Sequence, residues 1–180
     1  MSQALAFAGQ RMESLSLGGN GVSAANIQLK AVLLDEIMNR AAQGYDTFYC
    51  GAAHGADMLF GNLVLWVRVT TYPALRLICV IPHEGQATNW PEEWRDMYFK
   101  LLEHAYDMVL ISHRYTSDCY HRGNRYMIEN AKAPLALYDG IQPGDAAYAV
   151  EYARRKGREI VLIDPDTQKR GVVPPRLEIL

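Results

Sequence analysis

The chain has 180 residues, and its 18 Lys and Arg residues nearly balance its 20 Asp and Glu residues, for a formal net charge of −2. Hydrophobic residues make up 49% of the chain, which excludes an intrinsically disordered protein because enough apolar surface can be buried on folding. The small net charge excludes a generally basic nucleic-acid coat, so nucleic acid is not an expected partner. We predict one domain over residues 1–164 and a C-terminal tail over 165–180 packed on or beside it.

Short apolar runs alternate with helical segments along the chain. Strands are predicted, in chain order, at residues 4–8, 47–50, 75–81, 108–112, 135–138 and 159–163. Helices are predicted between them, over residues 26–42, 56–69, 91–104, 123–131 and 145–156. The alternation predicts an α/β fold, a Rossmann-like three-layer sandwich with a mainly parallel sheet of about six strands. The proline-containing tail after Asp164 is predicted to be irregular or packed across a sheet edge.

Targeting and redox features indicate a cytoplasmic location. The first residues lack a basic flank followed by a long apolar stretch, so no secretory signal is predicted. No stretch reaches the roughly 18 apolar residues that a membrane-spanning helix needs, so no membrane contact is expected. The three cysteines, Cys50, Cys79 and Cys119, form no CxxC pair and predict neither a disulfide framework nor a zinc site. Cys50 and Cys79 lie in apolar runs and are expected to be buried.

The loop after the second predicted strand, GAAHGAD, is the most informative segment. Gly51 allows a tight turn, and Gly55 opens an apolar helix whose unpaired N–H groups and positive dipole end can hold a phosphate. His54 inside the loop is a candidate ligand contact. Asp57 would compete with a phosphate, so it fits a ribose-hydroxyl acceptor or a loop organiser better. An equally simple interpretation is a tight strand-to-helix turn that binds no ligand.

Other strand ends add cations, glycines and aromatic residues. Arg11, Arg122 and Arg125 could hold a negatively charged group, and Gly140 with Gly144 forms a second glycine-bearing helix start suited to an anion. A further set shares one predicted helical face and could stack on a base or, more simply, pack on the sheet: Trp90, Trp94 and Tyr98.

Motif spacing argues against several classes of site. The histidines show no HExxH-type spacing, so no metal site is predicted, and no GxSxG elbow supports covalent catalysis. The GxGxxG fingerprint is absent from the first strand–helix turn, where only Gly9 occurs, which disfavours a nicotinamide oxidoreductase. The glycine-rich residues 18–21 lie too far past the strand to form that motif and are interpreted as a flexible loop or lid. No cofactor is predicted.

The strand-end motifs resemble the YpsA-like group of the SLOG superfamily, Rossmann-like relatives of the LOG phosphoribohydrolases and of DprA. The matching segments, spread over about residues 4–163, are AGQR at 8–11, GAAHGAD at 51–57, Pro82 with Asn89-Trp90, and Arg122-x-Asn124. The resemblance implies a pocket for a nucleotide or nucleotide derivative. Phosphate would be held by Gly51, Gly55 and Ala56 with Asp57 at the helical end, and the polar wall would be completed by Arg11, Arg122 and Asn124.

Two departures from that superfamily bear on catalysis. Gln10 stands where the group more often has a histidine, which removes one acid–base group. LOG enzymes carry a PGGxGTxxE-type motif after the fifth strand, whereas residues 142–148 here read QPGDAAY. Counting three residues on from Gly144, we expect the glutamate of the motif at position 147, where this chain has Ala147. Cleavage of an N-glycosidic bond by the LOG route would therefore lack its acid–base group.

We therefore predict a sensor or regulatory module that binds a nucleotide-like small molecule. The alternative is a hydrolase or transferase acting on a nucleotide's glycosidic or phosphate bond, with Glu84 or Asp57 as general base. A protein-interaction role and association into a homo-oligomer stay open, and no catalytic residue is assigned. The predicted ligand-binding residues are Gly9, Arg11, Gly51, His54, Gly55, Ala56, Asp57, Glu84, Arg122, Asn124, Gly140 and Gly144.

Overall fold

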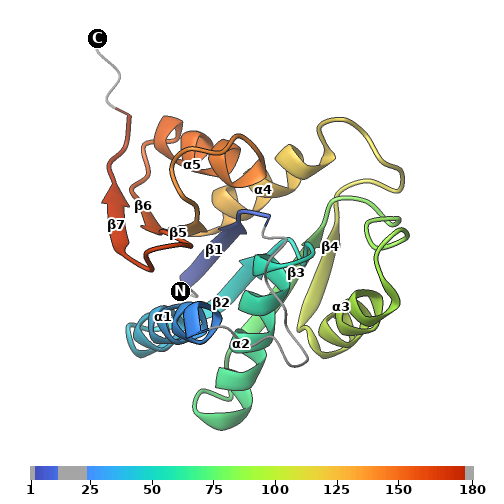
Figure 1. The fold of residues 1–180 in the computed structure, drawn as a ribbon, viewed down its shortest axis with the longest axis horizontal. Coiled ribbons are helices and arrows are strands. Elements are labelled where there is room, and N and C mark those ends of the chain that lie inside the picture. Colours follow the sequence, from blue (N-terminus) through green and yellow to red (C-terminus); the bar gives the residue numbers. More distant parts are fainter. Residues whose placement is uncertain (1–2, 12–23, 177–180) are drawn as a thin grey trace.

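The computed structural model describes residues 3–11 and 24–176 (Figure 1). Its strands are β1 (Gln3–Gly9), β2 (Tyr45–Cys50), β3 (Arg76–Ile81), β4 (Asp107–Leu110), β5 (Ala133–Leu137), β6 (Ile160–Ile163) and β7 (Arg170–Val173). Its helices are α1 (Ala24–Ala42), α2 (Ala56–Thr70), α3 (Glu92–His104), α4 (Cys119–Asn130) and α5 (Asp145–Arg155). The predicted loop or lid at 18–21 lies outside the described residues.

The strands form one sheet in the order β4-β3-β2-β1-β5-β6-β7. All neighbouring pairs are parallel except β6 and β7, which pair antiparallel. The chain builds outward from β1 to β4 on one side and then returns to place β5 on the other side of β1. The strand order therefore reverses between β1 and β5, and ligands of doubly wound sheets bind at such a point. The predicted α/β fold class is confirmed.

Helices cover both faces of the sheet, α1 to α3 on one and α4 with α5 on the other (Figure 1). Strand β1 shows why both faces can be covered. Its large side chains, Leu5 and Phe7, point to the α1–α2 face, where the Phe7 ring stacks on Phe60 with centroids 4.1 Å apart. Its alanines point to the other face, and small side chains there let α4 and α5 pack close to the strand.

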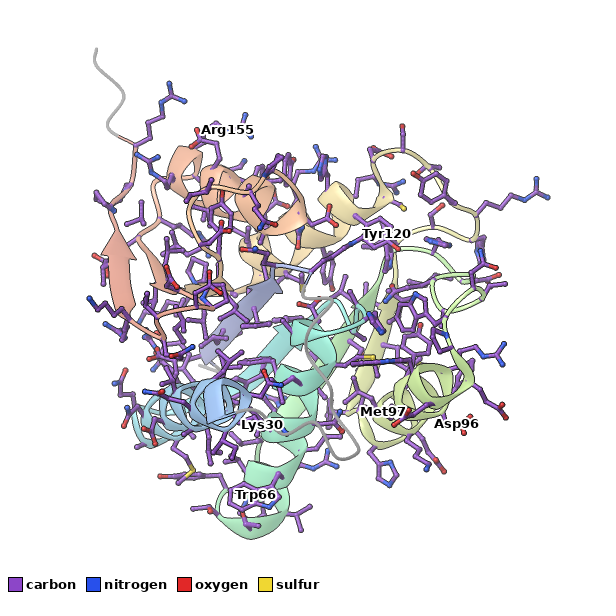
Figure 2. The ribbon with its side chains drawn as sticks, in the orientation of Figure 1. Lys30, Trp66, Asp96, Met97, Tyr120 and Arg155 are labelled. Atoms are coloured by element: carbon purple, nitrogen blue, oxygen red, sulfur yellow. The ribbon has the colours of Figure 1, made fainter. Side chains whose placement is uncertain are left out.

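Several predicted boundaries and environments need correction. Helix α4 begins at Cys119 rather than at residue 123, because its polar first turn gives no apolar periodicity. The residues of α2 are apolar nearly all round, which predicts a buried helix, but Val69 is 80% exposed and Trp66 is 53% exposed (Figure 2). Cys50 and Cys79 are buried, as predicted.

Strand β7 is absent from the predicted elements. Its residues are mostly exposed and form no apolar run, so the sequence pattern carries little signal for a strand. Pairing with β6 and the Arg170 side chain hold it in place: Arg170 Nε donates to Oε2 of the buried Glu36 on α1 at 3.2 Å. The tail thus extends the sheet at its edge.

Candidate functional site

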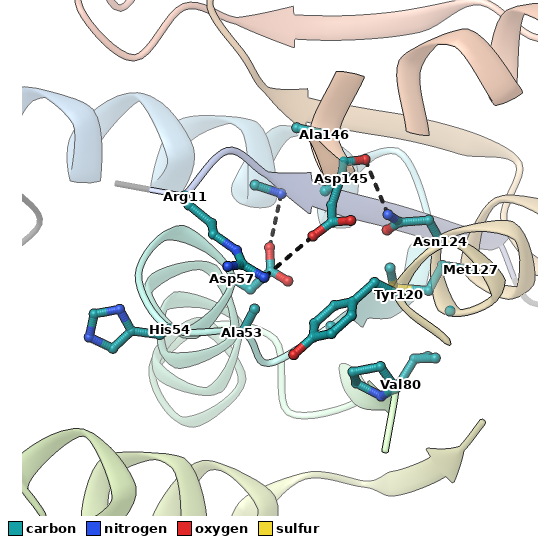
Figure 3. Close-up of a pocket in the computed structure, with 15 residues that line it drawn as sticks. Arg11, Ala53, His54, Asp57, Val80, Tyr120, Asn124, Met127, Asp145 and Ala146 are labelled. Carbon is teal, nitrogen blue, oxygen red and sulfur yellow. Dashed lines mark hydrogen bonds and ion pairs between the residues drawn. The ribbon is translucent and has the colours of Figure 1, made fainter. Parts of the chain in front are cut away.

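The carboxyl ends of β1, β2 and β3 face the start of α4 and α5 across a small cavity, which we call the central pocket (Figure 3). Five segments that are distant in sequence meet there, at the point where the strand order reverses. The pocket offers about 40 Å³ to the centres of water molecules. At 10–15 Å³ for each, that is room for about three waters. Only a small part of a ligand can therefore enter it.

The Asp57 side chain organises the floor of this pocket. The Gly9 N–H donates to Asp57 Oδ1 at 2.9 Å, and the backbone N–H groups of Ala53 and Gly51 also bond to the carboxylate. A Cβ atom on Gly51 would lie 2.7 Å from Asp57 Oδ2, and one on Gly9 would lie 2.8 Å from Oδ1. The two glycines therefore make room for a carboxylate of the protein itself, which occupies amides that a bound phosphate would need.

The same burial changes the acidity of Asp57. Removal from water raises the pKa of this carboxyl from 3.8 to about 7, and the Asp145 charge adds to the rise. The hydrogen bonds from Gly9, Ala53 and Gly51 oppose it by stabilising the charged form. At neutral pH the Asp57 carboxyl is therefore present in both protonated and ionised forms.

Arg11 and Asp145 lie at the mouth of the central pocket. Arg11 Nη2 is 3.8 Å from Asp145 Oδ2, and the Arg11 side chain is 74% exposed (Figure 3). The guanidinium carbon also lies 5.6 Å from the centre of the Tyr120 ring. An ion pair this long and exposed contributes little to stability, so the guanidinium can turn toward an anionic ligand at small cost.

Asn124 joins α4 to the start of α5. Its side chain is buried, and its Nδ2 donates to the backbone oxygen of Asp145 at 3.2 Å (Figure 3). The amide oxygen of Asn124 has no partner within residues 3–11 and 24–176, and the residue lines the central pocket. A hydrogen-bond acceptor is thus available to a ligand.

A second cavity, which we call the α5 groove, adjoins the central pocket. Its volume is about 250 Å³, and it shares Gly9, Arg11, Asp145 and Ala146 with that pocket. Its other lining residues are Gln10, Tyr138, Gln142, Pro143, Gly144 and Ala147. Gly144 precedes α5 with φ +147°, and a Cβ there would meet nothing within 4 Å. The groove therefore lies open beside the N-terminal amides of α5.

Gln10 ties the loops after β1 and β5 together beside the α5 groove. Its Oε1 accepts from the Asp139 N–H at 3.0 Å, and its Nε2 donates to Asp139 Oδ2 at 3.2 Å. The other carboxylate oxygen of Asp139 accepts from the N–H groups of Ile141 and Gln142. These bonds shape the loop that leads to α5, a structural role for the residue that departs from the group's usual histidine.

His54 packs against α3 rather than standing free in the loop. The centre of its ring lies 3.8 Å from the Trp94 ring and 5.6 Å from the Trp90 ring. Burial, together with the positive charge of Arg11, lowers the pKa of His54. Tyr98 is itself buried, so this aromatic set packs within the protein, in keeping with the simpler of the two predicted roles.

The structure brings together about half of the predicted ligand-binding residues. Those lining the central pocket are Gly9, Arg11, Gly51, His54, Asp57 and Asn124, and Gly144 lines the α5 groove. Gly55 and Ala56 begin α2 but do not line either cavity. Gly140 also lines neither, and two charged residues point elsewhere. Glu84 is exposed and pairs with His113 at 2.7 Å, and Arg122 donates to the Ile111 carbonyl.

Sequence reasoning missed three residues that shape the site. Asp145 and Tyr120 line the central pocket. Asp145 had a usable signal, an acidic residue next to the glycine that starts a helix, whereas Tyr120 precedes the predicted start of its helix. Gln86 is buried and its Nε2 donates to the carbonyls of Gly51 and Ala52 at 3.2 and 3.0 Å. No local pattern marks a glutamine that supports a distant loop.

Within residues 3–11 and 24–176, no group of three or more His, Cys, Asp or Glu side chains is placed to hold a metal ion. None of the helices in these ranges is both long and apolar enough to cross a membrane.

The chain is similar to known proteins over most of its length. The family model described as YspA SLOG family matches residues 6–167. A UPF0398 protein of Bacillus cereus (strain B4264) is 30% identical over 72% of this chain and 71% of its own, and one of Bacillus thuringiensis (strain Al Hakam) is 33% identical over 57% and 56%. The X-ray structure of TM1055, a structural-genomics target, superposes with a TM-score of 0.54 at 14% identity, covering 91% of this chain and 75% of that one, which supports the fold. The chain belongs to the YpsA family of SLOG proteins, as its strand-end motifs predicted.

Proposed function

We propose that this protein binds a nucleotide or nucleotide-derived small molecule where β1, β2 and β5 end, and acts as a sensor or regulatory binding module. One observation carries the proposal. Two adjoining cavities lie where the strand order reverses, and both are lined by Arg11. Membership in the SLOG family indicates a nucleotide-related role and supports the same ligand class.

The sizes of the cavities support a ligand that extends over both. The central pocket, at about 40 Å³, takes only a fragment, while the α5 groove, at about 250 Å³, can take a larger group. An anionic group fits best near Arg11 and the N-terminal amides of α5, because a guanidinium and a helix N-terminus both favour negative charge. Gly144 leaves the space beside those amides open.

One observation favours the alternative, a hydrolase or transferase acting on a nucleotide. Asp57 has a pKa raised to about 7 by burial and shares the central pocket with Asp145, and a carboxyl tuned in this way suits general acid–base catalysis. Glu84, the other candidate base, lines neither cavity. The binding module remains the better supported function. Counted from Pro143-Gly144, the glutamate of the LOG motif falls at Glu151 rather than at Ala147, and Glu151 pairs with Arg154 and Arg176 and lines neither cavity.

The proposal is tested by titrating AMP, GMP, CMP and UMP into the protein by isothermal calorimetry and following products by chromatography. We expect at least one nucleotide to bind without turnover, and Arg11→Gln to weaken binding about 10-fold or more through loss of a charge-assisted contact. Arg155→Gln is the matched control. Arg155 is the last residue of α5 and lies far from Tyr120, which lines the central pocket (Figure 2). Turnover that Asp57→Asn abolishes would establish the enzyme instead, and absence of binding would refute both.

A further inference from the structure

We propose that the central pocket receives the ribose hydroxyl groups of the ligand, and that the phosphate stays outside it, beside Arg11. This inference rests on the proposed nucleotide binding and adds which part of the nucleotide occupies the central pocket. It places the phosphate away from the start of α2, where the glycine-rich loop alone would put it.

The charges around the central pocket oppose an anion inside it. Two carboxyl groups line the pocket, those of Asp57 and Asp145. Arg11 is the one arginine or lysine lining it in the described ranges, and it lies exposed at the mouth, paired with Asp145. His54, the histidine of the lining, has a lowered pKa and is mainly neutral at neutral pH. A phosphate on the floor would lose its water beside two acidic groups, which costs free energy.

The backbone N–H groups that could offset this cost are already used, and Gly55 and Ala56 at the start of α2 do not line the pocket. The Asp57 carboxylate accepts from Gly9 N–H at 2.9 Å and is bonded by the N–H groups of Gly51 and Ala53. It also fills the space that the two glycines leave free. An ionised carboxylate has about four acceptor positions, so these bonds leave about one for a ligand. Asp57 can therefore accept from a donor, whereas another anion there would be repelled.

The Asn124 side chain also indicates that the part of the ligand in the central pocket is a hydrogen-bond donor. It is 7% exposed, its Nδ2 is committed to the Asp145 carbonyl, and its Oδ1 has no partner among the described residues. Among the described residues, the buried side-chain atoms without a partner are His54 Nε2 and Gln86 Oε1, so the Asn124 oxygen is open to water. A donor on the ligand can replace that water and keep the hydrogen bond. A hydroxyl group fits this oxygen, the remaining acceptor position of Asp57 and the small volume. The two carboxyl groups would also attract an ammonium group, but the nucleotide of the proposed function carries none, whereas its ribose carries hydroxyl groups.

The test compares sugars that differ by one hydroxyl. AMP, GMP, CMP and UMP are each titrated beside their 2′-deoxy and 3′-deoxy counterparts and beside inorganic phosphate. We expect one or both deoxy forms of a binding nucleotide to bind about 10- to 100-fold more weakly, as when a buried hydrogen bond to a site built for it is lost. Inorganic phosphate should compete only weakly, because it lacks the hydroxyl contacts.

Variants of two asparagines on α4 provide a second measurement. Asn124→Ala should abolish most of the discrimination between ribose and deoxyribose forms. Asn130→Ala should leave it unchanged, because Asn130 makes a similar bond, from Nδ2 to the Tyr126 carbonyl, at the other end of the helix. Thermal unfolding shows whether each variant is folded, and the deoxy series on the unchanged protein decides the question if Asn124→Ala is not.

The outcomes separate this inference from the proposed function. Nucleotides that bind equally well with and without the 2′- and 3′-hydroxyls would overturn the hydroxyl-first orientation and leave nucleotide binding intact. Inorganic phosphate that binds as tightly as a nucleotide and displaces it would also overturn that orientation. No binding by any of the four nucleotides would refute the proposed function and, with it, this inference.

Discussion

Replacing Asp57 with asparagine should change how the stability of the protein depends on pH. Burial raises the pKa of Asp57 from 3.8 to about 7 in the folded state, so the folded protein holds this proton over a range where the unfolded chain has released it. Stability from this group is therefore fully present below about pH 4 and is lost as the pH rises toward 7. A rise of about 3 pKa units corresponds to about 4 kcal/mol in total.

The assay is urea unfolding of wild type and Asp57→Asn at a series of pH values from 4.5 to 7.5. The free energy of unfolding of wild type, relative to the variant, should fall by about 3 kcal/mol over this range. Asparagine cannot reproduce every hydrogen bond to Gly9, Gly51 and Ala53, but that loss is a constant offset and leaves the slope unaffected. Three ionisable side chains share the pocket with Asp57, namely Asp145, Arg11 and His54. They are present in both proteins, so their own effects on stability largely cancel in the comparison.

Asp139→Asn serves as a control of opposite sign. Hydrogen bonds, above all from the Gln142 N–H, lower the pKa of Asp139 below its usual value. Its stabilising effect is therefore present above about pH 4 and lost only as the pH falls further. The difference between wild type and Asp139→Asn should stay level from pH 4.5 to 7.5. A difference between wild type and Asp57→Asn that is equally level would refute the burial argument for Asp57.

Two further predictions concern the packing that holds the site and the sheet edge. Gly51→Ala should destabilise the protein by about 1–3 kcal/mol in urea unfolding, because the added Cβ lies 2.7 Å from Asp57 Oδ2. Gly171→Ala, with nothing within 4 Å, should change stability by less than about 0.5 kcal/mol, and equal effects would contradict the close approach. Glu36→Ala should cost about 2–3 kcal/mol and speed hydrogen exchange in β7, because buried Glu36 bonds both Arg40 and Arg170. The more exposed Glu151, which pairs with Arg154 and Arg176, is the control, and an unchanged exchange rate in β7 for Glu36→Ala would refute the anchoring role.

The local pattern of the sequence determined the fold class and the end of the sheet where the candidate site lies. Continuous apolar runs such as Leu77–Ile81 suit central strands, because both of their faces need cover. Strands alternating with helices then require parallel pairing, which brings Gly9 and Gly51 to the same edge of the sheet. Both glycines, with Arg11, Asp57 and Asn124, were predicted on this reasoning or on the family resemblance, and they do meet at one pocket.

Only the tertiary structure decided what the glycine-rich loop surrounds. The sequence shows glycines between a strand and a helix, which leave space where a side chain would otherwise stand. A phosphate or a carboxylate can fill such a space equally well. The carboxylate of Asp57 fills it, through a bond to Gly9, which lies 48 residues away in the chain. The exposed strand β7 and the glutamine beneath the loop are likewise held by partners distant in sequence. Periodicity reports which face of an element is buried, whereas the partner that each polar group meets depends on contacts between segments that no local pattern encodes.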